Sequence, residues 1–254
     1  MLALGMLTAV AAAAPASAQV PVPVGQPGQS EPSAQQSQAS APSYRRLSDE
    51  RRLSRWAHAV ARARVRAKPA RSARTITRLR YETEDGFPEV YLALLSYQAA
   101  DGQRWVQVRL PMRPNGRKGW VPRSALGAFH VTRQRLVLSR RRLRLTFYQR
   151  GRKRWSAPVG IGKRGTPTPA GHFWVRERIR VRNPSSGYWP YAFGTSAYSR
   201  LTDWPGGGVV GIHGPYYAES RIPGRISHGC IRLRRRDDWW LGRHLGIGTP
   251  LLIK

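Results

Sequence analysis

The sequence predicts a mostly β protein with two small β-rich domains, and three observations support this class. Short apolar segments alternate with polar residues over most of the chain, and Gly, Pro, Asn and Asp turns separate them. Helical spacing is confined to two short segments. The 254 residues leave room for one or two domains with their own cores.

The N-terminal segment has the features of an export signal. Residues 1–18 are uncharged, apolar and short, and they end in the small residues Ala16 to Ala18. This pattern predicts a signal peptide and export to the cell wall, periplasm or extracellular space. No basic residue precedes the apolar run, so an uncleaved anchor stays an alternative. We expect no membrane span in the mature chain, because no other segment is long and apolar enough.

Residues 19–44 are mostly Gln, Ser, Pro, Ala and Gly. This composition predicts a disordered linker, because it offers too little apolar surface to offset the entropy of ordering.

Residues 45–128 are predicted to form a small all-β domain with a short leading helix. Leu53, Trp56, Ala57, Val60 and Ala61 have helical spacing. Alternation then predicts strands at 63–67, 90–95, 105–110 and 119–121, with turns at 84–86, 101–102 and 114–116.

The order of motifs in this region resembles bacterial SH3-like domains. Val65-Arg66-x-x-Pro69 is followed by a turn, by Trp105-Val106-x-Val108, and by Gly119-Trp120-Val121-Pro122. The resemblance implies a small barrel that binds peptide or glycan, while a packing module with buried Trp residues stays an equal alternative.

Residues 129–254 are predicted to form a second β-rich domain with one short helix. Strands are expected at 136–138, 143–147, 159–162, 173–175, 209–212 and 248–253, and a helix at 237–245.

Charge and cysteine content narrow the possible functions. The 44 basic residues against 13 acidic ones give a formal charge of +31, which predicts attraction to a polyanion unless it is only a solvated surface. Export makes an anionic cell-wall polymer the expected polyanion rather than nucleic acid, for which no binding motif is visible. With one Cys and few carboxylates we expect no metal and no cofactor.

The single cysteine has the surroundings of a nucleophile. Cys230 follows His228 and Gly229, and Arg232 lies two residues further on. A nearby imidazolium and guanidinium are expected to lower the thiol pKa, which favours the thiolate. Gly229 leaves room for a substrate carbonyl and for backbone donors to its oxygen. A structural thiol is the alternative.

Several motifs in order resemble the L,D-transpeptidases of the YkuD type. His213-Gly214 precedes Ser227-His228-Gly229-Cys230-Ile231-Arg232-Leu233, while Thr168-Pro169-Ala170-Gly171-His172-Phe173 and Gly248-Thr249-Pro250 match other family elements. The resemblance implies a cysteine acyltransferase that forms a thioester with a peptidoglycan tetrapeptide stem, releases D-alanine and cross-links the stem to a neighbouring amine.

The resemblance also assigns roles to residues. It implies Cys230 as nucleophile and His213 as base, with the carbonyl of Gly214 orienting the imidazole; spacing alone leaves His213 and His228 open. His228, Gly229 and Gly214 are expected around the oxyanion or behind it, and Arg232, Ser227 and Tyr216 at the substrate. Tyr188, Trp189, Tyr191 and Tyr217 are expected in a capping loop or in ordinary packing. An L,D-carboxypeptidase and a non-catalytic basic wall-binding protein stay alternatives.

Overall fold

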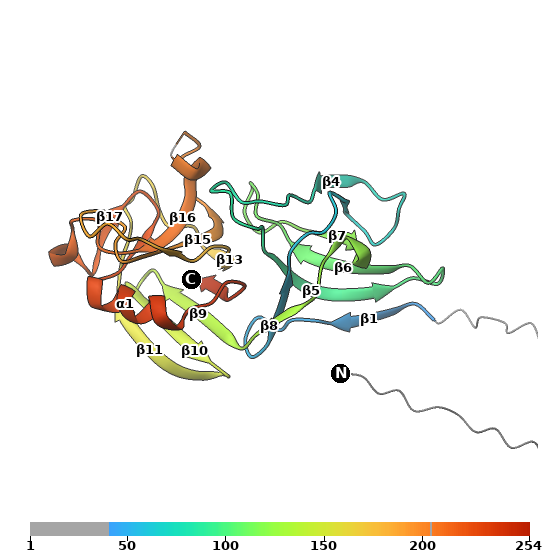
Figure 1. Cartoon of the computed structure of the whole chain (residues 1–254), viewed down its shortest axis with the longest axis horizontal. Coiled ribbons are helices and arrows are strands. Elements are labelled where there is room, and N and C mark those ends of the chain that lie inside the picture. The colour runs from blue at the N-terminus through green and yellow to red at the C-terminus, as the bar shows by residue number, and fades with distance from the viewer. Residues whose placement is uncertain (1–40, 204) are drawn as a thin grey trace, which may run out of the picture. The chain divides into compact units, whose positions relative to one another are not determined.

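Eight strands form the first sheet of the computed structural model, which describes residues 41–203 and 205–254 (Figure 1). The sheet order is β4-β3-β7-β6-β5-β2-β8, and β1 pairs with β5. The bounds are β1 (Ser43–Arg46), β2 (Ser54–Ala57), β3 (Arg64–Arg66), β4 (Thr75–Arg78), β5 (Tyr91–Gln98), β6 (Arg104–Arg109), β7 (Lys118–Pro122) and β8 (His130–Thr132), with a 3-10 turn η1 (Arg123–Ala125).

This sheet agrees with the strands expected at 63–67, 90–95, 105–110 and 119–121. The leading helix is wrong, because Trp56 and Ala57 lie in strand β2. β2 is paired on both edges, with β5 and β8, and is buried between them, so its apolar positions have no simple period of two. The SH3-like assignment stays a prediction, and β8 extends the sheet to residue 132.

The signal peptide predicted at 1–18 and the first part of the linker predicted at 19–44 lie outside the described residues. The last two residues of that linker range, Ser43 and Tyr44, begin strand β1. In the described part of the chain, no helix is long and apolar enough to cross a membrane.

Two further sheets enclose the second core. One has the order β11-β10-β9-β19-β13 and the other β14-β15-β16-β18-β12-β17. The strands are β9 (Gln134–Ser139), β10 (Arg144–Gln149), β11 (Arg152–Pro158), β12 (Gly160–Gly162), β13 (Gly171–Trp174), β14 (Ile179–Arg180), β15 (Tyr191–Tyr198), β16 (Val209–His213), β17 (Gly224–Ser227), β18 (Ile231–Arg232) and β19 (Pro250–Ile253). Two 3-10 turns, η2 (Pro205–Gly208) and η3 (Glu219–Arg221), precede β16 and β17.

The helix predicted at 237–245 is present as α1 (Arg235–His244), the one α-helix in the described ranges. Leu241 is fully buried in the same core as Leu136 and Ile212, and Trp240 stacks on Trp155 with 5.0 Å between ring centroids. At the start of α1, the buried carboxylate of Asp238 accepts a hydrogen bond from the backbone N–H of Tyr191 at 2.9 Å. The helix thereby holds the first residue of β15, the strand beside His213.

Side-chain packing and hydrogen bonds join the first sheet to the two sheets of the second core. Trp174, 2% exposed, donates its indole N–H to the carbonyl of Val90 at 2.7 Å and packs with Trp56 and Leu92. Asn115 makes two hydrogen bonds with the backbone of Tyr198, at 2.8 and 3.0 Å. The described residues, 41–203 and 205–254, consequently belong to one compact unit.

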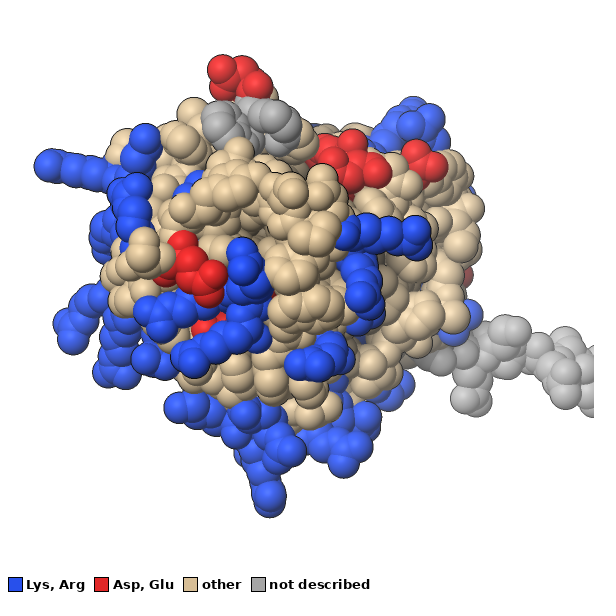
Figure 2. Space-filling model, turned by 60° about the vertical axis from the view of Figure 1, so that its left-hand side comes forward, with Lys and Arg blue, Asp and Glu red and all other residues tan. Residues whose placement is uncertain are grey.

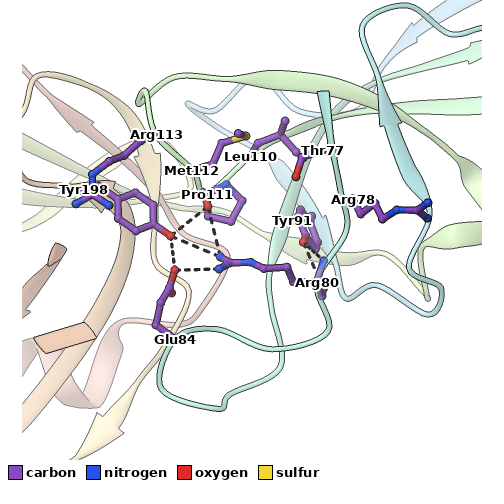
Figure 3. A pocket seen from close by; sticks show the side chains of 10 residues that line it. All are labelled: Thr77, Arg78, Arg80, Glu84, Tyr91, Leu110, Pro111, Met112, Arg113 and Tyr198. Atoms are coloured by element: carbon purple, nitrogen blue, oxygen red, sulfur yellow. Dashed lines mark hydrogen bonds and ion pairs between the residues drawn. The ribbon is translucent and has the colours of Figure 1, made fainter. Parts of the chain in front are cut away.

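A buried ionic cluster lies at the junction, the contact between the first sheet and the second core. Arg176, 1% exposed, donates to Glu89 from Nε at 2.7 Å and to Glu84 from Nη2 at 2.8 Å, and Glu89 is fully buried. Arg80 contacts both of these carboxylates, at 3.1 and 3.0 Å. Figure 3 shows the outer part of the cluster, where the hydroxyl of Tyr198 meets Glu84 and Arg80.

We expect Arg176→Met to lower the free energy of unfolding by about 3 kcal/mol or more, because the variant keeps a buried Glu89 carboxylate with a weaker set of partners. Urea denaturation followed by tryptophan fluorescence measures the change. Arg236→Met is the matched control: Arg236 is 77% exposed and 3.8 Å from Asp237, so its loss should cost less than about 1 kcal/mol. Equal losses in the two variants would contradict the role of the cluster.

Candidate active site

The turn between β17 and β18 carries Cys230 and is held by side-chain hydrogen bonds. The Ser227 hydroxyl donates to the carbonyl of Cys230 at 2.6 Å and accepts the N–H of Gly229 at 3.1 Å. The buried Thr168 hydroxyl donates to the carbonyl of Gly229 at 2.6 Å. Gly229 has φ +132°, and a Cβ there would lie 3.0 Å from Ser199, so glycine is required.

His213 ends β16 with its ring orientation fixed by the backbone. Nδ1 lies 2.8 Å from the carbonyl of Gly214, and because a carbonyl only accepts, Nδ1 carries the proton. The other ring nitrogen, Nε2, is therefore free of hydrogen and can accept a proton. Gly214 is packed so closely on the carbonyl of Trp189 that a Cβ would collide with it.

Gly211 lies next to both the Cys230 thiol and the His213 imidazole. Its N–H donates to Cys230 Sγ at 3.4 Å. A Cβ at Gly211 would lie 3.9 Å from Cys230 Sγ and 3.7 Å from Cδ2 of His213, the carbon next to Nε2. The thiol and the proton acceptor thus share one face of β16.

The electrostatics of this pair differ from the expectation. Burial raises the pKa of the Cys230 thiol, and the opposing effects of the Gly211 N–H and of Arg232 are smaller. Burial and the positive charge of Arg232 lower the pKa of His213 to about 4. The predicted lowering of the thiol pKa is therefore wrong in its net direction, and both groups are neutral near pH 7.

Arg232 and two tyrosines surround the imidazole. β16 and β18 pair in parallel with His213 opposite Arg232, which places the guanidinium beside the imidazole. Arg232 lies over the ring of Tyr216 at 4.9 Å, and the ring centroid of Tyr188 is 4.7 Å from that of His213. These aromatic rings cover one side of the site. Tyr191, expected in a capping loop or in ordinary packing, is buried in strand β15.

Two further expectations concern the turn between β17 and β18. Ser227 was expected to bind substrate, but it is 1% exposed and its hydroxyl is used within the turn. Gly229 was expected around the oxyanion or behind it, and its N–H is bonded to Ser227 within the turn. Sequence spacing could not show either contact, because both arise from the folding of the turn on itself. His228 is exposed on the same turn.

A cavity of about 460 Å³ opens on Cys230 and His213. Its lining includes residues that sequence reasoning missed: Asp85 from the β4–β5 loop, Glu177 from the segment between β13 and β14, and Gly194 from β15. Asp85 lies in a turn that the sequence does predict, but no local pattern links this turn to Cys230. In the residues that the structure describes, no three His, Cys, Asp or Glu side chains gather as metal ligands.

Comparisons with known proteins identify the catalytic region. Residues 133–253 match the family model of the YkuD L,D-transpeptidase catalytic domain. A search of curated proteins finds no match.

Solved structures with similar folds include L,D-transpeptidases from three organisms. An L,D-transpeptidase from Mycobacterium tuberculosis H37Rv is 22% identical, with 54% of this chain and 71% of that chain covered and a TM-score of 0.39. The C442S mutant of the Enterococcus faecium enzyme is 22% identical, with 48% and 49% covered and a TM-score of 0.36. A Mycobacterium smegmatis enzyme is 16% identical, with 60% and 91% covered and a TM-score of 0.38.

The match spans about half the length of the Enterococcus chain. The match of the family model covers the turn with Cys230, the end of β16 with His213 and the loop with Thr168. Residues 133–253 therefore form a catalytic domain of the YkuD L,D-transpeptidase family.

Proposed function

We propose that this protein is a cysteine acyltransferase that cross-links peptidoglycan stem peptides. The observation that carries the proposal is the shared cavity of Cys230 and His213, in which the Gly214 carbonyl leaves Nε2 of the imidazole free to accept a proton. Membership of residues 133–253 in the YkuD family supplies the reaction class.

In the first step, the thiol proton passes to Nε2 of His213 while Sγ attacks a peptide carbonyl of the donor stem. The bond from this carbonyl to the nitrogen of the terminal D-alanine breaks, and the imidazolium returns the proton to the leaving amine. Because both groups are neutral at rest, His213 acts as a general base during attack rather than as the partner of a preformed thiolate.

In the second step, an amine of a neighbouring stem attacks the thioester. It loses a proton to His213, the C–S bond breaks, and the thiolate takes the proton back. Water in place of the amine would give the carboxypeptidase reaction, so the products distinguish the two activities.

We place this reaction at the cell wall, and the surface charge supports that location. Exposed basic side chains lie on the β10–β11 hairpin. Figure 2 shows Lys and Arg side chains spread over much of one face of the protein. The members on the hairpin and its turns are Arg141, Arg142, Arg144, Arg150, Arg152, Lys153 and Arg154. This surface would concentrate the enzyme at anionic wall polymers.

Replacing Cys230 by Ser should abolish both D-alanine release and cross-link formation, because the less acidic hydroxyl cannot replace the thiol as nucleophile in this site. Mass spectrometry of the products from tetrapeptide-stem muropeptides measures both activities. Retention of either activity by Cys230→Ser would refute the thioester route, and release of D-alanine without cross-links in the wild type would favour the carboxypeptidase.

His213→Ala should lower kcat by roughly 10² to 10⁴-fold, the usual contribution of a positioned general base. The same substitution at the exposed His228 is the comparison, and its effect should be much smaller. A larger loss in His228→Ala than in His213→Ala would exchange the roles of the two histidines.

Arg232→Gln should shift the alkylation of Cys230 by iodoacetamide to higher pH. Burial already raises the thiol pKa, and Arg232 partly opposes this rise, so removing the guanidinium raises the pKa further. Intact mass gives the rate of adduct formation at each pH. The midpoint of this pH profile is compared between the wild type and Arg232→Gln. Arg225→Gln, at an exposed position of β17, controls for the loss of one positive charge; an unchanged midpoint in Arg232→Gln would show that Arg232 does not act on the thiol.

A further inference from the structure

The β6–β7 loop of the first sheet reaches the β15–β16 connection (residues 199–208, described except at 204). Arg113 of this loop donates from Nη2 to three carbonyl oxygens of the connection. Those of Leu201 and Gly207 lie at 2.9 Å, and that of Ser199 lies at 3.2 Å. Backbone carbonyls need a hydrogen-bond donor, and a charged donor binds them more strongly than a neutral one. The guanidinium therefore holds the two ends of the connection together.

Three consecutive glycines at the end of the connection make such a contact important. Gly206, Gly207 and Gly208 have φ values of +70°, +63° and +77°. Glycine loses more backbone freedom on folding than any other residue, so a run of three is costly to hold in one conformation. Within the connection, the N–H of Ser199 donates to the carbonyl of Gly208 at 2.8 Å. Arg113 adds contacts from the first sheet that hold the same residues.

The side chain of Arg113 is fixed in turn by Tyr198, the last residue of β15. Its guanidinium lies over the Tyr198 ring, 4.7 Å from the ring centroid, as Figure 3 shows. Asn115 of the same loop makes two hydrogen bonds with the backbone of Tyr198, and the Tyr198 hydroxyl donates to Glu84. The guanidinium thus has a defined position relative to the end of β15.

The connection lies against the turn that carries Cys230. A Cβ at Gly229 would lie 3.0 Å from the Cβ of Ser199, so Ser199 packs directly on this turn. Gly206 lines the cavity that holds Cys230, whereas Arg113 lies outside this lining. The connection continues directly into β16. A displaced connection would therefore change both the support of the nucleophile and one wall of the cavity.

We propose that Arg113 is a positioning residue for acyl transfer, which holds the β15–β16 connection where the donor peptide fits the cavity and the Cys230 turn is supported. The proposal rests on the function proposed above, and it makes the first sheet part of the catalytic structure. Arg113 acts through the connection and does not touch the peptide. Cys230 and His213 have their own backbone contacts, with Gly211 and Gly214, so the loss of Arg113 should affect peptide binding more than the chemical step.

The test uses Arg113→Met, which keeps an unbranched stem over Tyr198 but has no hydrogen-bond donor for the three carbonyls. With a tetrapeptide-stem donor, the variant should lose roughly 10- to 100-fold in kcat/KM, the effect expected when a group of the site moves by about 1 Å. KM should change more than kcat, because the wall of the cavity contacts the peptide and not the reacting atoms. Release of D-alanine, followed by mass spectrometry, gives both constants.

The same variant should make Cys230 more reactive toward a small reagent. Burial is the main cause of the raised pKa of the thiol, so a displaced connection should expose the thiol, lower its pKa and speed its alkylation by iodoacetamide near pH 7. Slower turnover of the peptide together with faster alkylation cannot arise from damage to the thiol itself. Alkylation needs no peptide, so it tests the action of Arg113 independently of the proposed reaction.

Two control variants separate this role from loss of charge and loss of stability. Arg117→Met removes an exposed arginine of the same loop and should change neither reaction. Val106→Ala removes buried methyl groups from the core of the first sheet, so it should lower stability without changing KM or alkylation.

Unchanged alkylation in Arg113→Met, an unchanged KM beside an active wild type, or the same changes in Val106→Ala would overturn the proposal. Faster alkylation in Arg113→Met alone, with a wild type that turns over no stem peptide, would refute the acyl transfer and support the action of Arg113 on the Cys230 turn.

Discussion

The contact of Arg176 with Glu84 and Glu89 is the constraint on which both halves of the described structure depend. It ties the β4–β5 loop to the strand region before β14, and both partners of its inner pair are withdrawn from water. A buried ion pair gives little net stability relative to apolar packing, but breaking it leaves an uncompensated charge. The main effect of the ion pair is therefore to hold the β4–β5 loop against the segment that carries Arg176. This position of the loop brings Asp85 to the cavity.

Neutral groups position Cys230 and His213. A carbonyl, that of Gly214, orients His213, and a backbone N–H, that of Gly211, contacts the thiol. Burial keeps both side chains uncharged, with the pKa of His213 lowered to about 4. A carboxylate in the position of the Gly214 carbonyl would raise the imidazole pKa and would attract Arg232 next to it. The backbone carbonyl avoids both effects.

Much of the fold was predictable from local pattern. The alternation over 105–110 and 143–147 corresponds to β6 and β10, and the spacing over 237–245 to α1. The pattern failed where burial on both sides removes it. The residues of β2 have helical spacing, and no strand is predicted over β15, which consists of aromatic and small residues. Both strands are interior members of their sheets, and interior position depends on partners far away in sequence.

For the site, short sequence motifs were predictable, whereas contacts that depend on folding were not. Cys230, His213 and the carbonyl of Gly214 belong to short motifs whose residues stay together in sequence and in space. The use of Ser227 within the turn and the rise of the thiol pKa depend on folding and burial, so composition and neighbours could not reveal them. Asp85 and Glu177 are 92 residues apart, and only the loop held by Arg176 brings them to one cavity.

Several of the few acidic residues lie close together, and electrostatic screening explains how they can coexist with the basic surface. Glu84, Asp85, Glu89 and Glu177 lie together at the junction, within a chain of 13 acidic and 44 basic residues. At physiological ionic strength the field of exposed arginines decays over about 8 Å, whereas charges inside a cavity are screened much less. A basic surface and a cavity lined by Asp85 and Glu177 can therefore coexist in one small protein.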